Sequence, residues 1–133
     1  MNSRQRKKVL SSLLAMQVGI LNKKLYGEKK YKTRYKVSIR PLHMPEYNRK
    51  TIYCLNGKIK FEIRAAEEHH NTAHFHVTKP GEGSGSYRIE DLSKLQSSLR
   101  PSTEKIILKW ASENQQLLKQ VWNEYHGKRI YVN

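Results

Sequence analysis

The sequence predicts an α+β domain, in which a small, mainly antiparallel sheet of about four strands packs against a long C-terminal helix, with an additional basic N-terminal helix. Three observations predict this class. Apolar and polar residues alternate over 58–64 and again over 74–78, as in strands. Asn56-Gly57 precedes the first of these segments as a hairpin turn signal. Apolar residues after Pro101 recur at helical spacing.

The length of 133 residues is enough for one domain with a modest core, so we expect 1–133 to be a single domain. Within it, 1–36 is predicted to be a basic N-terminal helical extension, 37–57 a connector with strands, and 58–126 an α+β core.

The N-terminal helix is expected from about Arg4 to Tyr26, with Gly27 as its stop. Its apolar residues at helical spacing are Val9, Leu10, Leu13, Leu14, Val18, Ile20, Leu21 and Leu25. Residues 1–36 hold 11 basic residues against one acidic residue, which places +10 of the total charge of +15 there. The helix either packs on the core with a solvated basic face or contacts nucleic acid. The candidate contacts are Arg4, Arg6, Lys7, Lys8, Lys23 and Lys24.

The connector is predicted to contain strands over 36–40 and 51–55, the first ending at Pro41. Tyrosines alternate with cations here. Such residues either stack bases and hold phosphates or simply form strand faces and solvated surface.

In the core, the alternation over 58–64 points Ile59, Phe61 and Ile63 inward. Strands over 74–78 and 86–89 flank a Gly-rich loop, and 90–95 is expected to be a short helix or turn. One helix is predicted from about Ser102 to Tyr125. Its tryptophans, Trp110 and Trp122, are expected to be core anchors.

Composition limits the possible partners and location. The excess of 26 basic over 11 acidic residues indicates a polyanionic partner. The single cysteine, Cys54, excludes an internal disulfide and a Cys-rich zinc site, and it is compatible with a reducing, cytoplasmic location. Residues 9–21 lack the features of a secretory signal, and no stretch approaches the roughly 20 apolar residues of a membrane span. We therefore expect nucleic acid rather than a membrane as partner, and RNA before DNA.

Histidines cluster in one short segment, where four of the six in the chain lie within eight residues, 69–76. His74 and His76 flank Phe75 on a predicted strand, so their side chains point to the same face. His70 would reach them from the preceding loop. Imidazoles grouped in this way can bind a metal, move a proton or hold a phosphate.

Around this segment the sequence resembles domain-of-unknown-function family 4160. The resemblance rests on Phe61-Glu62-Ile63-Arg64, His70-Asn71-Thr72-Ala73-His74-Phe75-His76-Val77, Tyr87-Arg88-Ile89, Leu108-Lys109-Trp110-Ala111 and Trp122. It covers about residues 58–126. Thr72 and Ala73 stand where the family motif has two prolines. The resemblance implies a prokaryotic protein often encoded beside another small protein, in arrangements that resemble toxin–antitoxin pairs.

Three hypotheses follow for the histidines. In the first, His70, His74 and His76 perform acid/base chemistry on RNA, with Arg64, Lys79 and Arg88 near the phosphate. In the second, the same histidines bind a metal together with Glu67 or Glu68. In the third, they form a hydrogen-bonded network that holds the fold, or they contact a partner.

The first hypothesis predicts a toxin-like, RNA-targeting effector, a metal-independent ribonuclease that needs no cofactor. The alternative is a non-enzymatic DNA- or RNA-binding regulator, or a phage- or defence-related effector that binds nucleic acid or a small acidic partner protein. The sequence leaves the oligomeric state open.

Overall fold

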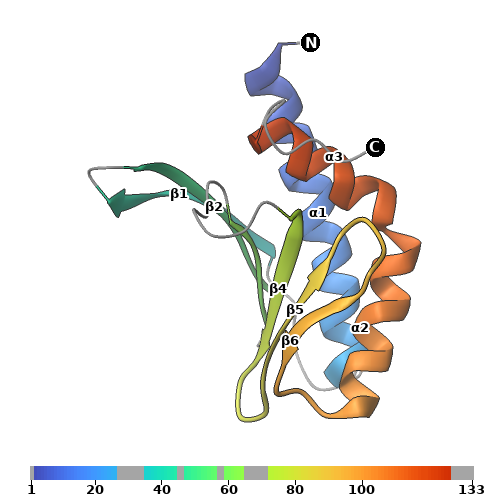
Figure 1. Cartoon of the computed structure of the whole chain (residues 1–133). Helices are drawn as coiled ribbons and strands as arrows, with labels where there is room; N and C mark the ends of the chain where they lie inside the picture. The colour runs from blue at the N-terminus through green and yellow to red at the C-terminus, as the bar shows by residue number, and fades with distance from the viewer. Residues whose placement is uncertain (1, 27–34, 45–46, 57–58, 65–71, 127–133) are drawn as a thin grey trace.

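The computed structural model describes residues 2–26, 35–44, 47–56, 59–64 and 72–126, and the side chains of 2–26, 59–63 and 72–124. Its elements, in chain order, are α1 (Ser3–Tyr26), β1 (Tyr35–Met44), β2 (Tyr47–Asn56), β3 (Ile59–Arg64), β4 (His74–Lys79), β5 (Gly83–Arg88), β6 (Lys94–Ser97), α2 (Pro101–Glu113) and α3 (Gln115–His126) (Figure 1). The predicted α+β class, with helices at both ends of the chain, is confirmed.

The strands form one sheet in the order β1-β2-β3-β4-β5-β6, and every neighbouring pair is antiparallel. The strands predicted over 36–40, 51–55, 58–64, 74–78 and 86–89 are present as β1 to β5. The segment 90–95 differs in part from the prediction, because it begins as a turn but then enters β6 at Lys94. A single register irregularity against β5 lies between Ser86 and Tyr87.

The β1–β2 hairpin is longer than the strand beside it. All ten residues of β1 pair with β2, but β3 pairs only with Thr51–Asn56 of β2. Residues 47–50 therefore have no partner on β3. The outer half of the hairpin extends beyond the rest of the sheet as a two-stranded arm (Figure 1).

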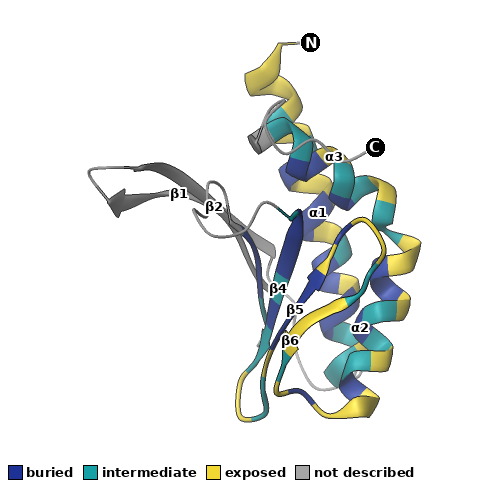
Figure 2. Cartoon of the chain, viewed as in Figure 1, coloured by how far each residue is buried: buried dark blue, intermediate teal, exposed yellow. Residues whose placement is uncertain are grey.

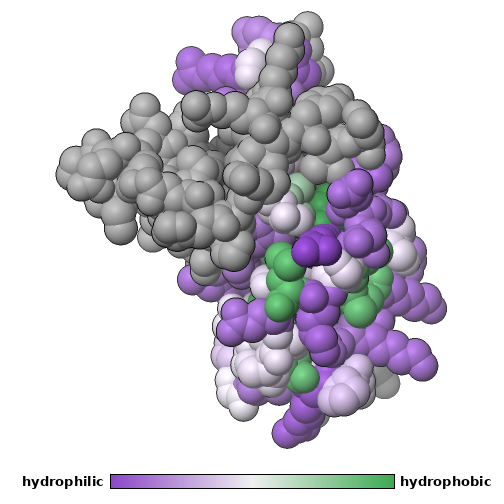
Figure 3. All heavy atoms as spheres, viewed as in Figure 1, coloured by the Kyte–Doolittle hydropathy of each residue, from purple (hydrophilic) through white to green (hydrophobic). Residues whose placement is uncertain are grey.

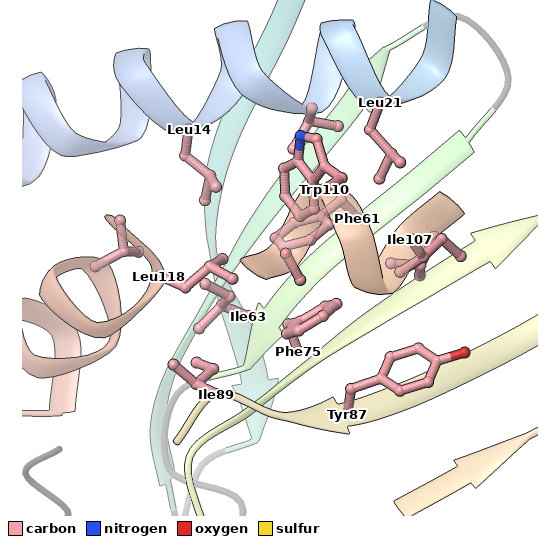
Figure 4. Packing of buried hydrophobic residues seen from close by; sticks show 14 of the residues in the cluster. Leu14, Leu21, Phe61, Ile63, Phe75, Tyr87, Ile89, Ile107, Trp110 and Leu118 are labelled. Atoms are coloured by element: carbon pink, nitrogen blue, oxygen red, sulfur yellow. The ribbon is translucent and has the colours of Figure 1, made fainter. Parts of the chain in front are cut away.

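The helices cover the face of the sheet that carries Phe61 and Phe75 (Figure 4). Ile59, Phe61 and Ile63 are all buried, as their alternation predicted. The rings of Phe61 and Phe75 stack with centroids 5.4 Å apart, and the Trp110 indole of α2 meets Phe61 edge-on, also at 5.4 Å. The predicted role of Trp110 as a core anchor is confirmed.

Helix α1 begins at a reciprocal cap. The Gln5 backbone N–H donates to the Asn2 side-chain oxygen at 2.9 Å, and the Asn2 N–H donates to the Gln5 side chain at 3.0 Å. Further along, Leu14 and Leu21 are fully buried against the core (Figure 4). The Trp110 indole N–H donates to the Gln17 carbonyl oxygen at 2.7 Å, which fixes α1 to α2. The predicted N-terminal helix is thus present and packs on the core.

The prediction of a single long C-terminal helix is wrong, because the helix is interrupted at Asn114. There φ is −117°, and the side-chain amide of Asn114 donates to the Trp110 carbonyl at 2.9 Å. Asparagine competes for backbone groups in this way and so favours helix ends. The new helix is then tied to the sheet through Gln115, whose side chain donates to the carbonyls of Ile89 and Glu90.

Within the described part of the chain, no helix is long and apolar enough to cross a membrane. The described surface in Figure 3 is mostly hydrophilic, with small apolar patches.

Candidate functional site

The face of the sheet turned away from Phe61 and Phe75 is polar around the histidines. His74 and His76 alternate with Phe75 and Val77 along β4, so the two imidazoles share this face, as predicted, and their ring centroids are 4.9 Å apart. Directly opposite residues in a sheet point to the same side. The register places Glu62 and Ser86 on either side of His76, and Arg88 beside His74. We call these five residues the polar sheet face.

His74 is held firmly in place. Only 1% of its surface is exposed, and its Nδ1 lies 2.7 Å from the Thr72 carbonyl oxygen. A carbonyl only accepts hydrogen bonds, so Nδ1 carries the hydrogen. β4 pairs with β3 only from His76 onward, and the Trp122 indole of α3 lies 5.7 Å from the His74 ring. His74 is therefore buried between the start of β4 and α3, with its tautomer set by the chain just before it.

His76 lies in a row with Glu62 and Ser86 across three strands. Glu62 is buried, and Lys60 Nζ lies 3.5 Å from its carboxylate. The Nε2 atom of His76 is itself shielded from solvent. Glu62 was not among the predicted site residues. The alternation over 58–64 indicated that this carboxylate faces away from the core, but only the pairing of β3 with β4 places it opposite a histidine.

The chemistry of the pair depends on access. General acid/base catalysis needs an imidazole nitrogen within hydrogen-bond reach of the substrate. In His74 one nitrogen is bonded to Thr72 and the ring is covered. In His76 the Nε2 atom is covered. The geometry therefore fits a packed histidine–carboxylate row better than an open catalytic cleft.

A metal site at the histidines was the second hypothesis. Among the residues that the structure describes, no three His, Cys, Asp or Glu side chains lie close enough to hold a metal ion. His70, Glu67 and Glu68 lie outside the described residues. The proposed three-histidine set is therefore reduced, in what can be described, to His74 and His76.

Of the cations predicted to lie near a phosphate, the two with described side chains, Lys79 and Arg88, are not gathered into one site. Arg88 is exposed on the polar sheet face, next to His74. Lys79 instead pairs with Glu82 at 3.3 Å, and its Nζ lies 5.3 Å from the Tyr26 ring centroid. The side chain of Arg64 lies outside the described ones.

The basic residues of α1 divide into two kinds. Two make ion pairs with the C-terminal helices: Arg6 with Glu124 at 3.2 Å, and Lys24 with Glu113 at 3.7 Å. Arg4 and Lys8 are exposed, and Lys7 and Lys23 are partly exposed. Part of the predicted basic surface is thus paired with carboxylates of the C-terminal helices.

Lys79 belongs to a cap on α2 built from the β4–β5 turn. One Glu82 carboxylate oxygen accepts from the Arg100 backbone N–H at 3.0 Å, and the other accepts from the Thr103 hydroxyl at 3.1 Å. Burial alone would raise the pKa of Glu82. The hydrogen bonds from Arg100, Thr103 and Lys79 outweigh it and hold that pKa below its ordinary value of 4.5. This negative charge at a helix N-terminus is a structural feature.

A second buried polar contact lies under β5 and β6. The Tyr87 hydroxyl donates to Glu104 at 2.8 Å. Burial raises the pKa of Tyr87, and the neighbouring Glu104 carboxylate raises it further. The pKa of Glu104 is lowered, because its hydrogen bonds with Tyr87 and Ser97 and the nearby Lys94 charge outweigh the effect of burial.

Comparison with known families gives a match over the second half of the chain. The model of "Domain of unknown function (DUF4160)" matches residues 58–123. This segment, just under half of the chain, is similar to the DUF4160 family. The predicted resemblance is thereby confirmed over β3 to α3. Neither the comparison with curated proteins nor that with solved structures gives a match.

The DUF4160 segment contains the polar sheet face and the Glu82 cap. It leaves out α1 and both strands of the β1–β2 hairpin. Most of the positive charge lies in this other part, since residues 1–56 hold 14 basic against two acidic residues, whereas 57–133 hold 12 against nine.

Proposed function

We propose that the protein binds single-stranded nucleic acid, RNA in preference to DNA, through its basic N-terminal region, and that it acts in the cytoplasm as a toxin-like effector. The observation that carries the proposal is the uneven charge just described. A net +12 over residues 1–56 provides the phosphate attraction that drives such binding and makes it depend on salt.

Helix α1 supports the proposal through its composition and exposure. It carries six basic residues and no acidic one. Arg4 and Lys8, in its first turns, are exposed, and Figure 2 shows the start of α1 coloured as exposed. Exposed cations of this kind can contact phosphates without giving up a contact that holds the fold.

The whole β1–β2 hairpin, of which the arm is the outer half, gives a second line of support. β1 and β2 contain four cations, Lys36, Arg40, Arg49 and Lys50, and no acidic residue. They also contain Tyr35, Tyr47 and Tyr53. Aromatic rings among cations suit single strands, because unpaired bases stack on the rings while the cations track the backbone.

The test measures binding of fluorescently labelled RNA and DNA of the same sequence over a series of salt concentrations. We expect Arg4→Gln/Lys8→Gln to weaken RNA binding about tenfold, and to lower the salt slope by about 1.4 for two lost single-strand contacts. Arg49→Gln/Lys50→Gln, on the arm, should also weaken RNA binding and lower the salt slope.

The matched control is Lys105→Gln/Lys109→Gln, which removes the same charge from the exposed side of α2. It should change affinity much less. Equal losses in the control and the α1 variant would contradict the assignment to the N-terminal region, and absence of RNA binding by the parent would contradict the function.

RNA cleavage is the second candidate function, favoured by the 4.9 Å separation of the His74 and His76 rings and by Arg88 beside them. It requires the covered imidazoles to become accessible. The parent, His74→Ala and His76→Ala are incubated with labelled RNA, with and without chelator, and circular dichroism checks folding. Catalysis by these histidines would be supported if the parent cleaves RNA and both variants fold but do not cleave it. Cleavage at the parental rate by both variants would exclude these histidines.

A further inference from the structure

Helix α1 has a second apolar face that the core does not use. Among the described residues, its Val9, Leu13, Met16 and Ile20 side chains are 40 to 55% exposed. They follow one another at spacings of four, three and four residues, which is the a/d pattern of a coiled-coil seam. We call these four residues the outer seam.

The outer seam lies opposite the side of α1 that packs on the core. At 100° per residue, Leu14, Val18 and Leu21 point to one side of the helix, and these three are fully buried. The seven buried residues of α1, which include these three, are together centred about 170° from the outer seam. A helix that is apolar on two opposite sides commonly packs against two partners. The core accounts for only one of them.

The outer seam has a cation at each end. Continuing the same spacing reaches Arg6 before Val9 and Lys23 after Ile20. Lys24 adds a further charge beside the second end, and α1 contains no acidic residue. Arg6 also pairs with Glu124, and its side chain remains 48% exposed. The seam is therefore about three apolar turns bounded by positive charge.

A second copy of this chain fits the seam poorly. If two α1 helices paired in antiparallel orientation, Arg6 of each would face Lys23 of the other. In parallel orientation, Arg6 would face Arg6 at one end and Lys23 would face Lys23 at the other. Like charges placed at the ends of a seam oppose pairing and disfavour that partner.

We propose that the outer seam docks an acidic amphipathic helix of another protein, with apolar residues against the four seam positions and carboxylates facing Arg6 and Lys23. The apolar seam would provide the contact, and the charges at its ends would select the partner and its orientation. This inference does not depend on the proposed binding of RNA.

The probe is a synthetic helical peptide of about 21 residues, with leucines at four seam positions and glutamates at the two flanking ones. A matched peptide carries lysines in place of the glutamates. Binding to the full chain is measured by fluorescence anisotropy. We expect the glutamate peptide to bind at least ten times more tightly than the lysine peptide.

Two variants test the seam and its ends. Leu13→Ser/Met16→Ser should weaken binding of the glutamate peptide at least tenfold. The control Leu95→Ser, which removes an exposed leucine from β6, should not. Lys23→Glu should weaken binding of the glutamate peptide and strengthen binding of the lysine peptide. Leu13→Ser/Met16→Ser should also leave RNA binding unchanged, so failure of this proposal and failure of the proposed function can be told apart.

Three results would overturn the inference. One is equal binding of the two peptides by the parent, or no binding of either. Another is dimerisation in light scattering that Leu13→Ser/Met16→Ser abolishes, which would make a second copy the occupant. The last is seam-dependent binding to phosphatidylglycerol vesicles without binding to the glutamate peptide, which would make a lipid surface the occupant.

Discussion

The Glu82 cap gives the sharpest prediction about stability. The Glu82 side chain is 8% exposed, and its carboxylate accepts from the Arg100 N–H, the Thr103 hydroxyl and the Lys79 ammonium at 3.0 to 3.3 Å. In Glu82→Gln the amide keeps one acceptor oxygen, while its NH₂ group faces donors. Loss of a capping interaction costs about 1 kcal/mol, and a donor left unsatisfied costs about 1 kcal/mol more. We therefore expect a loss of about 2 kcal/mol at neutral pH.

The effect should depend on pH with a defined sign. The pKa of Glu82 is lowered in the folded protein, so the ionised carboxylate contributes stability above about pH 4.5. That contribution is lost as the pH falls through the folded-state pKa. The difference between the parent and Glu82→Gln should accordingly be full at pH 7 and shrink below about pH 4.5.

Urea unfolding followed by tryptophan fluorescence measures the free energy of unfolding at each pH. The control is Glu90→Gln, an exposed glutamate at the other end of β5, which should change stability by less than about 0.5 kcal/mol. If Glu82→Gln were no less stable than Glu90→Gln at pH 7, or if its deficit stayed constant down to about pH 3, the role assigned to the cap would be refuted.

Two further substitutions test the core. An alanine at Gly85 would place its Cβ 2.5 Å from the Tyr87 hydroxyl oxygen, so Gly85→Ala should lower the free energy of unfolding by about 1–3 kcal/mol. Part of that loss should be recovered in a double-mutant cycle with Tyr87→Phe, and strict additivity would contradict the clash. Trp110→Phe removes the donor to the Gln17 carbonyl and leaves a cavity, so a loss of about 2–4 kcal/mol is expected in urea unfolding. A loss below about 1 kcal/mol would show that this hydrogen bond and its packing matter little.

Local patterns predicted much of the core. The alternation over 58–64 identified Ile59, Phe61 and Ile63 as buried, because the side-chain period of a strand is fixed by its backbone. The same period placed His74 and His76 on one face. These predictions depend only on residues a few positions apart.

Most of the features that local patterns did not predict depend on contacts between segments far apart in the sequence. The break at Asn114 interrupts an apolar stripe that continues through it, so periodicity alone did not reveal it. The buried Glu62 became part of the site only through the register of β3 with β4. The cap joins Glu82 to Arg100 across 18 residues of sequence, and nothing in the Gly-rich turn indicated that partner.

The hydrogen bond from Trp110 to Gln17 spans 93 residues of sequence and affects how the chain emerges during synthesis. At translation rates of about 5–20 residues per second, Gln17 of α1 is synthesised roughly 5–20 s before Trp110. Throughout that interval both the inner leucines of α1 and its outer seam lack the core that α2 completes. A nascent chain in this state offers two apolar surfaces to chaperones and to any binding partner already present. The order of synthesis would therefore let the partner proposed for the outer seam bind α1 before the domain has closed.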